Sequence, residues 1–540
     1  MSRVRWFVVI VIVVVFISAA GIAGAAGGSR RSAHVKAPVV KLHAPVLKLK
    51  RVSQGARLWV TRLARRPAVK AHRRALKPLT AGTNVDAAST SEDVLGGQSE
   101  TAIAATSAHV MAAWNDATAF VSSDSRQPSA SGTGVGYSAD GGYTFTDLVG
   151  LPNNRRNEAW SGDPSVVSLG DGVHFIVSSL YLPSSESFSL PKSVVCAHGP
   201  VENDVAVSVA TVTSNTTVSF TYPIVAARSA NYCKVTYPAF LDKPFGSYNA
   251  TSHTFVISYT KFGTDYHTPS AGAINMVRAV NVSPATPTPS FGSPIVIRAD
   301  DETVVNQGAS PAIANNGDTY VAWEHNLGGF TDPSMYIMVA RVPAGAGSPD
   351  TGTVVTSGQL LANPYGGVKS LGTVPIVGYS RGNGQDFPSI AYNPTTNRVI
   401  VEWNDASHHP LGDIFLRSLD ANLSLTAPIM KVNDDDSFAL HFMPAVSVRS
   451  DGSVASSWYD RRLWGPDSTH TDYFAEVRPS AGTAVSDFRV TTSSTNWAGV
   501  SSVINPNFGD YTDNASTGTT TYFTWSDGRL GIPQPFVASH

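Results

Sequence analysis

Hydrophobic and polar positions along this chain repeat in a two-strand pattern. Each copy begins with a small or proline-containing segment, continues through a turn, and ends in an apolar run that often closes with Trp. Short alternating runs predict β-strands, and the Asn-Gly or Asp-Gly pairs between them predict tight hairpins. Seven copies begin at Glu100, Asp163, Lys243, Ser310, Phe387, Met443 and Gly509.

Further apolar runs follow the copies, for example Asp413–Asp420 and Met335–Val342. The copies are spaced roughly 55 to 80 residues apart, which leaves room for four strands per copy, the content of a propeller blade. We therefore predict an all-β fold, a seven-bladed β-propeller, with six blades as the alternative. The last copy has room for three strands only, so we expect residues 84–97 to supply the fourth and close the ring.

The first 26 residues have a composition of their own. Arg3 and Arg5 precede an apolar run from Phe7 to Ile17, and small residues follow up to Ala26. This pattern is typical of a secretory signal. The uncharged stretch is also long enough for an uncleaved membrane anchor. Either reading predicts an extracytoplasmic protein, secreted or anchored at the cell surface.

Residues 27–83 are strongly basic. There are 15 Lys and Arg residues and no acid between Ser29 and Pro78, whereas all 40 acidic residues lie from Asp86 onward. Four prolines interrupt any long helix. We predict a disordered tail over 27–83, followed by the propeller over 84–540. The tail is either a spacer or an electrostatic contact to an anionic membrane or wall polymer. Because the body is acidic and exported, we expect no nucleic-acid partner.

Cys196 and Cys233 are the two cysteines of the chain. An even pair in an exported protein predicts a disulfide, here one that staples an insertion in the second repeat.

The stretch YSADGGYTF, residues 137–145, predicts a structural turn. Asp140 can accept hydrogen bonds from backbone N–H groups, and Ser138 can do so more weakly. Gly142 and its neighbour Gly141 tolerate the positive φ that tight hairpins require. The acid is therefore expected to brace the turn and not to catalyse.

This stretch resembles the Asp-box pattern S-x-D-x-G-x-T-aromatic of the sialidase-like, or BNR-repeat, β-propellers. The segment from Phe442 to Arg462 is also similar to blade repeats of bacterial secreted members, and the resemblance covers about residues 86–540. It implies that the turn lies far from the active face. Sialidases of the family hold a substrate carboxylate with three arginines and use a tyrosine nucleophile, a glutamate and an aspartate acid. The Arg-Ile-Pro motif of the first arginine is absent here, and no Tyr/Glu pair can be placed by motif, so the catalytic residues stay unknown.

Blade topology sorts the candidate residues by face. The loop entering the first strand and the loop leaving the second lie at one mouth of the central channel. Functional residues there should break the repeat, because a site is asymmetric. The ligand-binding candidates selected in this way are Arg461, Arg462, Arg529, Asp460, Asp527, Asp163, Asp386 and Tyr459.

The arginines carry two alternative interpretations. Arg461 or Arg462 could act with Arg529 as a clamp for a carboxylate or an acidic sugar, since a guanidinium matches two oxygens. The alternative is that they neutralise surrounding acids and hold loops. Adjacent side chains of an extended strand point to opposite faces, so one of the first two should pair with an acid such as Asp460.

The sequence leaves three functions open. The first is binding of a glycan or other surface polymer at the channel mouth. The second is glycoside hydrolysis of the sialidase type, and the third is a non-catalytic protein-interaction scaffold at the cell surface. We expect no cofactor and no metal site. The alternative is Ca²⁺ at the acidic loop from Asn433 to Ser437, which offers oxygen ligands but lacks EF-hand spacing.

Overall fold

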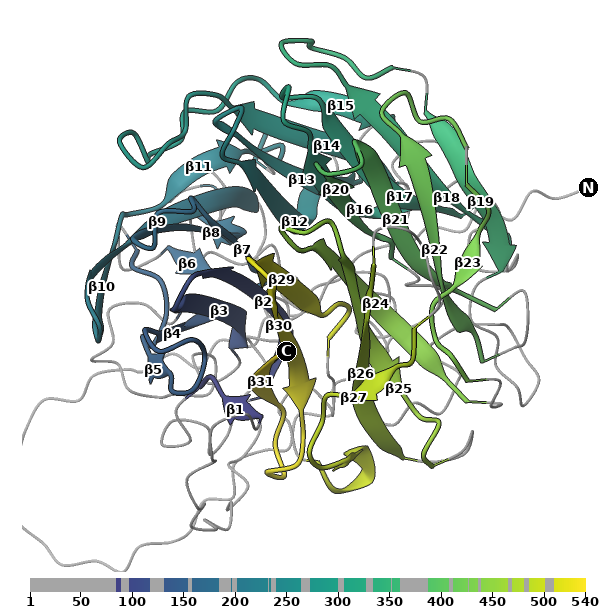
Figure 1. The fold of residues 1–540 in the computed structure, drawn as a ribbon. Helices are drawn as coiled ribbons and strands as arrows, with labels where there is room; N and C mark the ends of the chain where they lie inside the picture. Colours follow the sequence, from purple (N-terminus) through teal and green to yellow (C-terminus); the bar gives the residue numbers. More distant parts are fainter. Residues whose placement is uncertain are drawn as a thin grey trace, which may run out of the picture.

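The computed structural model is an all-β propeller of seven blades arranged around a central axis (Figure 1). It describes residues 84–88, 97–116, 131–153, 158–183, 196, 202–231, 233–234, 239–263, 272–299, 305–326, 334–350, 352–359, 387–406, 411–425, 427–435, 439–464, 469–479, 485–500 and 509–540. The predicted N-terminal signal or anchor and the basic tail lie outside these residues. Among the described residues, no helix has the length and apolar character needed to cross a membrane.

Each repeat copy forms the inner half of one blade, as the hydrophobic pattern predicts. Blades 1 and 2 contain β2 (Gln98–Thr106), β3 (His109–Asp116), β4 (Thr133–Ser138) and β5 (Thr146–Asp147), then β6 (Ala159–Trp160), β7 (Ser165–Ser168), β8 (His174–Leu182), β9 (Asp204–Ser214), β10 (Thr217–Phe220) and β11 (Ile224–Ala227). Blades 3 and 4 contain β12 (Phe240–Asn249), β13 (Thr254–Phe262), β14 (Gly272–Ala279) and β15 (Ile295–Arg298), then β16 (Val305–Ile313), β17 (Thr319–Asn326), β18 (Ser334–Val342) and β19 (Thr353–Gln359).

Blades 5 to 7 follow the same order. They contain β20 (Ser389–Asn393), β21 (Arg398–Asp405), β22 (Asp413–Asp420) and β23 (Met430–Lys431), then β24 (His441–Val448), β25 (Val454–Asp460), β26 (His470–Arg478), β27 (Phe488–Arg489) and β28 (Thr495–Asn496), and finally β29 (Asp513–Thr517), β30 (Thr520–Asp527) and β31 (Gln534–Ser539). The alternative of six blades is therefore wrong.

The hydrophobic core lies between neighbouring blades. The tryptophans that end the apolar runs sit on the second strands and are at most 1% exposed: Trp114, Trp323, Trp403, Trp458 and Trp525. One cluster, for example, joins Val339 of blade 4 to Trp403 and Phe415 of blade 5. A blade has two apolar faces, so this packing requires a neighbour on each side and hence a closed ring.

The N-terminal strand closes the ring, as the missing fourth strand of the last blade predicts. β1 (Val85–Asp86) pairs antiparallel with β31, the third strand of blade 7. Figure 1 shows purple β1 beside yellow β31. The side chain of Asn84 reinforces this short pairing. Its Nδ2 donates to the Val490 carbonyl at 2.8 Å, and its Oδ1 accepts from the Thr492 N–H at 2.6 Å and from Arg529 Nη2 at 2.9 Å.

The turn at residues 138–144 is braced as the sequence predicts. Ser138 Oγ donates to Asp140 Oδ1 at 2.8 Å, and Gly142 N–H donates back to Ser138 Oγ at 2.8 Å. Both the N–H and the hydroxyl of Thr144 donate to the Asp140 carboxylate. Gly141 N–H donates to the Ala108 carbonyl in the turn between β2 and β3, so both turns lie on the face opposite the mouth.

The predicted disulfide between Cys196 and Cys233 is confirmed. It links the segment between β8 and β9 to the segment that follows β11, and so staples blade 2.

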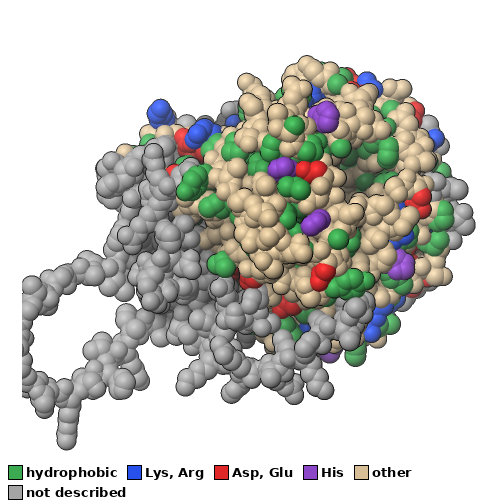
Figure 2. Space-filling model, turned by 60° about the vertical axis from the view of Figure 1, so that its left-hand side comes forward, with side chains coloured by type: hydrophobic (Ala, Val, Ile, Leu, Met, Phe, Trp, Pro, Cys, Tyr) green, Lys and Arg blue, Asp and Glu red, His purple; other side chains and the backbone are tan. Residues whose placement is uncertain are grey.

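On the face shown in Figure 2, charged side chains of both signs are scattered singly over the described residues.

Ring closure predicts a large effect at Asn84. Substitution Asn84→Ala removes hydrogen bonds to three residues of blades 6 and 7 and is expected to lower the free energy of unfolding by roughly 2–4 kcal/mol. Urea denaturation measures it. Deletion of residues 84–97 should destabilise the whole ring, since it opens the edge of β31.

The matched control is deletion of residues 29–78. It is expected to leave the melting temperature unchanged, because the tail predicted for this part of the sequence would bury little surface. Equal destabilisation by both deletions would show that the boundary of the propeller is misplaced.

Candidate functional site at the propeller axis

The innermost segments of the blades share an unusual backbone conformation near the mouth. Pairing of the inner strand with the second strand slips by one residue in blades 1, 3, 4 and 6, where two residues of the inner strand lie opposite one residue of its partner. A residue with positive φ stands at this bulge or at its equivalent in five blades: Glu100, Asp163, Lys243, Gly308 and Met443. Positive φ at a residue other than glycine costs about 1–3 kcal/mol, so the surrounding packing must hold these residues in place.

These bulge residues meet at the axis. A Cβ added at Gly509 would lie 2.6 Å from the backbone nitrogen of Glu100, so blades 7 and 1 approach closely. A Cβ at Gly308 would lie 2.1 Å from the ring of Phe387, which covers that glycine. The bulge position therefore carries acids in blades 1 and 2, a lysine in blade 3, and small or apolar side chains elsewhere.

Lys243 lies at the centre of this arrangement and is only 5% exposed. Its Nζ is 3.8 Å from the ring centroid of Phe387, 5.0 Å from that of Tyr511 and 5.7 Å from that of Phe245. The negative faces of aromatic rings attract an ammonium group, and the attraction grows when water is excluded. Three rings from blades 3, 5 and 7 thus hold one buried cation.

Four carboxylates surround the same ammonium group. Burial lowers the pKa of Lys243 to about 8, although the negative charges of Asp510, Glu100, Asp163 and Asp242 oppose that change. The amine therefore stays protonated at neutral pH. The backbone N–H of Lys243 also donates to Asp163 Oδ2 at 3.2 Å. We call Lys243, Phe387, Tyr511 and these four acids the axis cluster.

Tyr511 crosses from blade 7 to blade 2. Its hydroxyl donates to the Pro164 carbonyl at 3.2 Å. Burial, and then the negative charges of Glu100 and Asp163, raise the pKa of Tyr511 well above its ordinary value. This phenol is therefore held neutral, the opposite of what an activated nucleophile needs.

A small cavity of about 20 Å³ adjoins the axis cluster, with room for about one water molecule. Its lining includes the rings of Phe245, Phe387 and Tyr511 and the hydroxyl groups of Ser310, Ser389 and Thr512. Aromatic and hydroxyl groups from four blades thus converge at one point, which the repeat alone does not require.

Arg462 and Arg529, two of the predicted ligand-binding residues, occupy equivalent positions in a motif Trp-x-Asp-x-Arg. In blade 6, Trp458 Nε1 donates to Asp460 Oδ2 at 2.9 Å and Arg462 N–H donates to Asp460 Oδ1 at 2.7 Å. The Arg462 guanidinium lies 4.5 Å from the ring centroid of Phe474.

Blade 7 repeats this geometry. Trp525 Nε1 donates to Asp527 Oδ2 at 2.8 Å, and Arg529 Nη2 donates to the same oxygen at 2.6 Å. The Arg529 guanidinium lies 4.6 Å from the ring centroid of Phe536. Each arginine thus braces the mouth-face turn of its own blade, and neither contacts the axis cluster.

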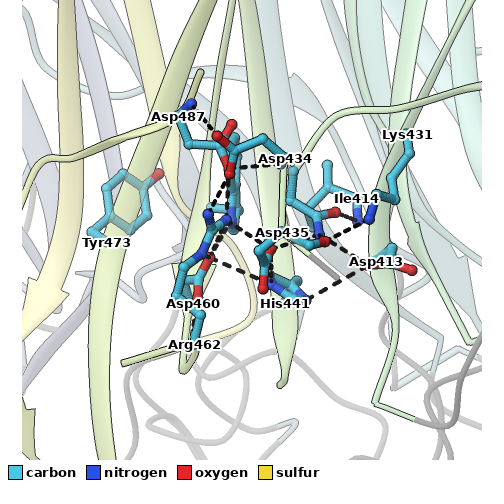
Figure 3. Close-up of polar contacts among 12 residues, drawn as sticks. Asp413, Ile414, Lys431, Asp434, Asp435, His441, Asp460, Arg462, Tyr473 and Asp487 are labelled. Atoms are coloured by element: carbon cyan, nitrogen blue, oxygen red, sulfur yellow. Dashed lines mark hydrogen bonds and ion pairs between the residues drawn. The ribbon is translucent and has the colours of Figure 1, made fainter. Parts of the chain in front are cut away.

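Arg462 also gathers carboxylates from neighbouring segments (Figure 3). Its Nη1 is 2.8 Å from Asp434 Oδ1, and its Nη2 is 2.6 Å from Asp487 Oδ2 and 3.1 Å from Asp435 Oδ1. Burial raises the pKa of Asp487 to about 7. The guanidinium of Arg462 is therefore the cation shared by these three acids and Asp460.

His441 is fully buried beside this network. Its Nδ1 is 2.9 Å from the Gly412 carbonyl oxygen, and its Nε2 is 3.1 Å from Asp435 Oδ1. Burial alone lowers the pKa of His441, but the charges of Asp460 and Asp435 outweigh it and raise the pKa above the ordinary 6.5. The imidazole therefore favours the protonated form next to these carboxylates.

The acidic loop considered for Ca²⁺ is part of the same network. Two sets of donor atoms lie within 4.8 Å of one another, Asp435 with His441 and Asp460, and Asp434 with Asp435 and Asp487. These oxygens could ligate a cation in principle. However, Arg462 already supplies positive charge to all four carboxylates. Asp436 and Ser437 of the loop lie outside the described residues.

The remaining candidates are distributed over the interior. Arg461 is 1% exposed, and its Nε donates to Thr471 Oγ1 at 3.2 Å. Tyr459, expected near the mouth, is buried between blades 6 and 7, where its hydroxyl donates to the Ser526 carbonyl at 2.9 Å. Asp163 belongs to the axis cluster. Asp386 lies outside the described residues.

Sequence reasoning missed Lys243, Glu100, Asp510 and Phe387. The signal was present, because Asp163, Lys243 and Met443 all directly precede a proline at the same point of their copies. Only the charge at this position changes from copy to copy. The asymmetry of the repeat thus lies at the inner bulge as well as at the strand ends.

The chain matches no protein-family profile, and no curated protein is significantly similar to it in sequence. Its structure is similar to that of a protein of unknown function from Dyadobacter fermentans, at 15% identity and TM-score 0.41, covering 74% of this chain and 100% of that chain. It is also similar to an α-L-arabinanase of Penicillium chrysogenum complexed with arabinobiose, at 12% identity and TM-score 0.42, covering 70% and 93%. A Trypanosoma rangeli sialidase in complex with sialic acid is similar at 10% identity and TM-score 0.39, covering 76% and 58%. Likeness at this level assigns no activity to the chain.

The ion-pair geometry predicts that Arg462 stabilises the fold. Arg462→Ala leaves four carboxylates without their shared cation and is expected to lower the free energy of unfolding by about 3–5 kcal/mol. Arg462→Lys keeps the charge but loses the forked contacts, so an intermediate value is expected. Chemical denaturation distinguishes the three proteins. An unchanged stability with lost binding of acidic glycans would support the clamp instead.

His441 predicts a pH-dependent stability. Because its folded pKa is raised, its contribution is fully present below the unfolded pKa of about 6.5 and disappears as the pH rises through the folded pKa. His441→Asn should remove that part of the dependence. The check is the difference in melting temperature between the two proteins from pH 5 to 8.5. A difference that is the same at every pH contradicts the prediction.

Proposed function

We propose that the protein binds a hydroxyl-rich glycan or similar surface polymer at the mouth of the propeller axis, without cleaving it. The observation that carries this proposal is the axis cluster. Its aromatic rings and single buried ammonium, together with the hydroxyl groups of the adjoining cavity, converge where the seven-fold pattern is broken. Rings that pack on apolar faces and a few placed polar groups are the usual composition of a ligand site.

The charges around the axis favour a neutral ligand. Four carboxylates, Asp510, Glu100, Asp163 and Asp242, face the single ammonium of Lys243. Like charge in a site of low dielectric repels an anion strongly. Arg462 and Arg529, which could have attracted an acidic sugar, are bound to Asp460 and Asp527.

Binding is better supported than hydrolysis. The hydroxyl of Tyr511 already donates to a backbone carbonyl, and its pKa is raised. Glu100 is fully buried and accepts from Asn115 Nδ2 at 2.6 Å. A general acid or base must reach the scissile bond or one water beside it, and these contacts hold the groups away from such a role.

We also place the protein outside the cytoplasm. The disulfide between Cys196 and Cys233 and the N-terminal signal-like pattern support this location. The basic segment 27–83 would then lie beside the cell surface, where anionic lipid or wall polymer could attract it.

The test is retention of the full-length protein on insoluble cellulose, chitin, xylan and arabinan, with an assay for released reducing ends. We expect retention on at least one polymer and no release. Lys243→Met removes the central charge in a side chain of similar length, and we expect about tenfold weaker binding. Lys431→Met is the matched control, since Lys431 lies on the outer strand β23 and contacts Asp435.

Three outcomes contradict this proposal in different ways. Release of reducing ends would make the protein a glycoside hydrolase. Equal retention of Lys243→Met and wild type would place the site elsewhere. No retention on any polymer would remove glycan binding altogether.

A further inference from the structure

One tryptophan differs from all the others that the structure describes. Trp114, Trp160, Trp323, Trp403, Trp458, Trp497 and Trp525 are at most 1% exposed, whereas Trp464 is 48% exposed. It lies in the turn after β25, on the mouth face of blade 6. Its backbone N–H donates to the Arg461 carbonyl at 2.9 Å, so the turn itself is formed.

The indole of Trp464 is fixed although it is exposed. Its Nε1 donates to Asp472 Oδ2 at 3.1 Å and to Ser494 Oγ at 3.0 Å. Asp472 is itself fully held, since its Oδ1 accepts from Arg489 Nη2 at 2.6 Å and from Thr491 Oγ1 at 2.9 Å. An indole donor bound to a buried carboxylate cannot swing freely, so the ring keeps one orientation.

One face of this ring is covered. His470 stacks on Trp464 with ring centroids 4.3 Å apart and an interplanar angle of 21°. The exposed fraction of Trp464 therefore lies on the opposite face and the outer edge. A flat apolar face that is rigid and open to solvent is a surface on which another flat apolar face can stack.

Polar groups lie next to the ring. Arg489 keeps 36% of its side chain exposed, and its Nε and Nη2 are bound to Asp472 and Ser494. Among the described residues, its Nη1 has no partner. Thr469 Oγ1 donates to Asn496 Oδ1 at 2.6 Å on the same edge of blade 6, where β26 pairs with β28. We call these polar groups around the Trp464 ring the rim. The rim offers hydrogen-bond donors and acceptors with little net charge, because Arg489 and Asp472 neutralise each other.

We propose that Trp464 is the platform of a second glycan subsite, which stacks on the apolar face of a pyranose ring. The C–H bonds on that face of a sugar point their partial positive charge at the negative face of the indole. Arg489 and the hydroxyl groups of the rim then bind the equatorial hydroxyls. The inference rests on the proposed function in one respect, that the ligand is a polymer long enough to occupy the axis and this subsite together.

The experiment uses the full-length protein and the soluble probes cellohexaose, chitohexaose and xylohexaose, with their monosaccharides for comparison. Calorimetry gives the affinities of wild type, Trp464→Ala, Trp464→Phe and Leu463→Ala. Leu463 is the matched control, because it is the neighbouring exposed apolar residue, at 52%. Iodide quenching of tryptophan fluorescence, with and without the hexasaccharide, reports whether the ring is covered.

For the hexasaccharide that wild type binds best, we expect Trp464→Ala to weaken binding about tenfold, the scale of one lost stacking contact. Trp464→Phe should restore part of it and Leu463→Ala should stay near wild type. The hexasaccharide should protect the quenchable fraction of wild type and not that of Trp464→Phe. The melting temperature of all variants should be unchanged.

Two results overturn the inference. If Trp464→Ala binds like wild type while Lys243→Met has lost binding, the subsite is wrong and the axis proposal stands. If no probe binds to wild type and none protects it from iodide, both proposals fall. A third result separates the two proposals in the other direction. If only the Trp464 variants lose affinity and protection from iodide, and Lys243→Met binds like wild type, the Trp464 subsite is supported and the axis site is wrong.

Discussion

The inner strands of all the blades must approach one axis, and the blades there come so close that a Cβ at Gly509 or Gly308 would collide with the neighbouring blade. The structure meets this constraint with a one-residue bulge in blades 1, 3, 4 and 6 and a residue of positive φ at the same point of blades 1 to 4 and 6. A bulge re-aims a side chain that would otherwise lie in the sheet. The backbone solution is repeated, whereas the side chain it delivers is not. That combination produces an asymmetric cluster from a symmetric fold.

Neighbouring blades are tied together at this same level. Asn115, which follows Trp114, accepts from the N–H of Asp163 in the next blade, and Asn404 accepts in the same way from Met443. In blades 6 and 7 the acid two positions after the tryptophan instead binds the indole and an arginine. The residues after the tryptophan therefore hold the mouth-face end of the blade in both arrangements. In one, an asparagine accepts a hydrogen bond from the next blade; in the other, an acid binds the indole and an arginine. Charged residues that follow a repeated strand end are for this reason more often structural than their composition suggests.

Much of the fold could be predicted from local rules. The spacing of Trp runs gives the blades, the Asn-Gly and Asp-Gly pairs give their hairpins, and the three-stranded last copy gives the closing role of the N-terminal strand. The turn around Asp140 could also be predicted, because the hydrogen bonds of Ser138 and Asp140 that brace it join residues 138–144. Apart from the closing strand, which follows from the missing fourth strand, these features depend on residues close together in the chain.

The site could be predicted only in part, because it depends on long-range placement. Asp163 was recognised by its position, but Lys243 acquires its role from Phe387 and Tyr511, which come from two other blades. Arg462 has the right chemistry for an anion site, yet Asp434 and Asp487 reach it from two other segments, 28 and 25 positions away in the chain. The closed ring of blades determines which of several similar charged side chains come into contact, and a local sequence pattern does not contain that information.

The closure of the ring has a mechanical consequence. The described N-terminal segment is held by the pairing of β1 with β31, by the Ala87 N–H, which donates to the Pro535 carbonyl, and by the side chain of Asn84, at the border of blades 6 and 7. Any pull on the N-terminal segment enters the fold there and acts first on β31 and on Arg529. If the segment tethers the protein to a surface, this clasp is the weakest point under load, and its release would open the ring from a single edge while the other blades were still packed.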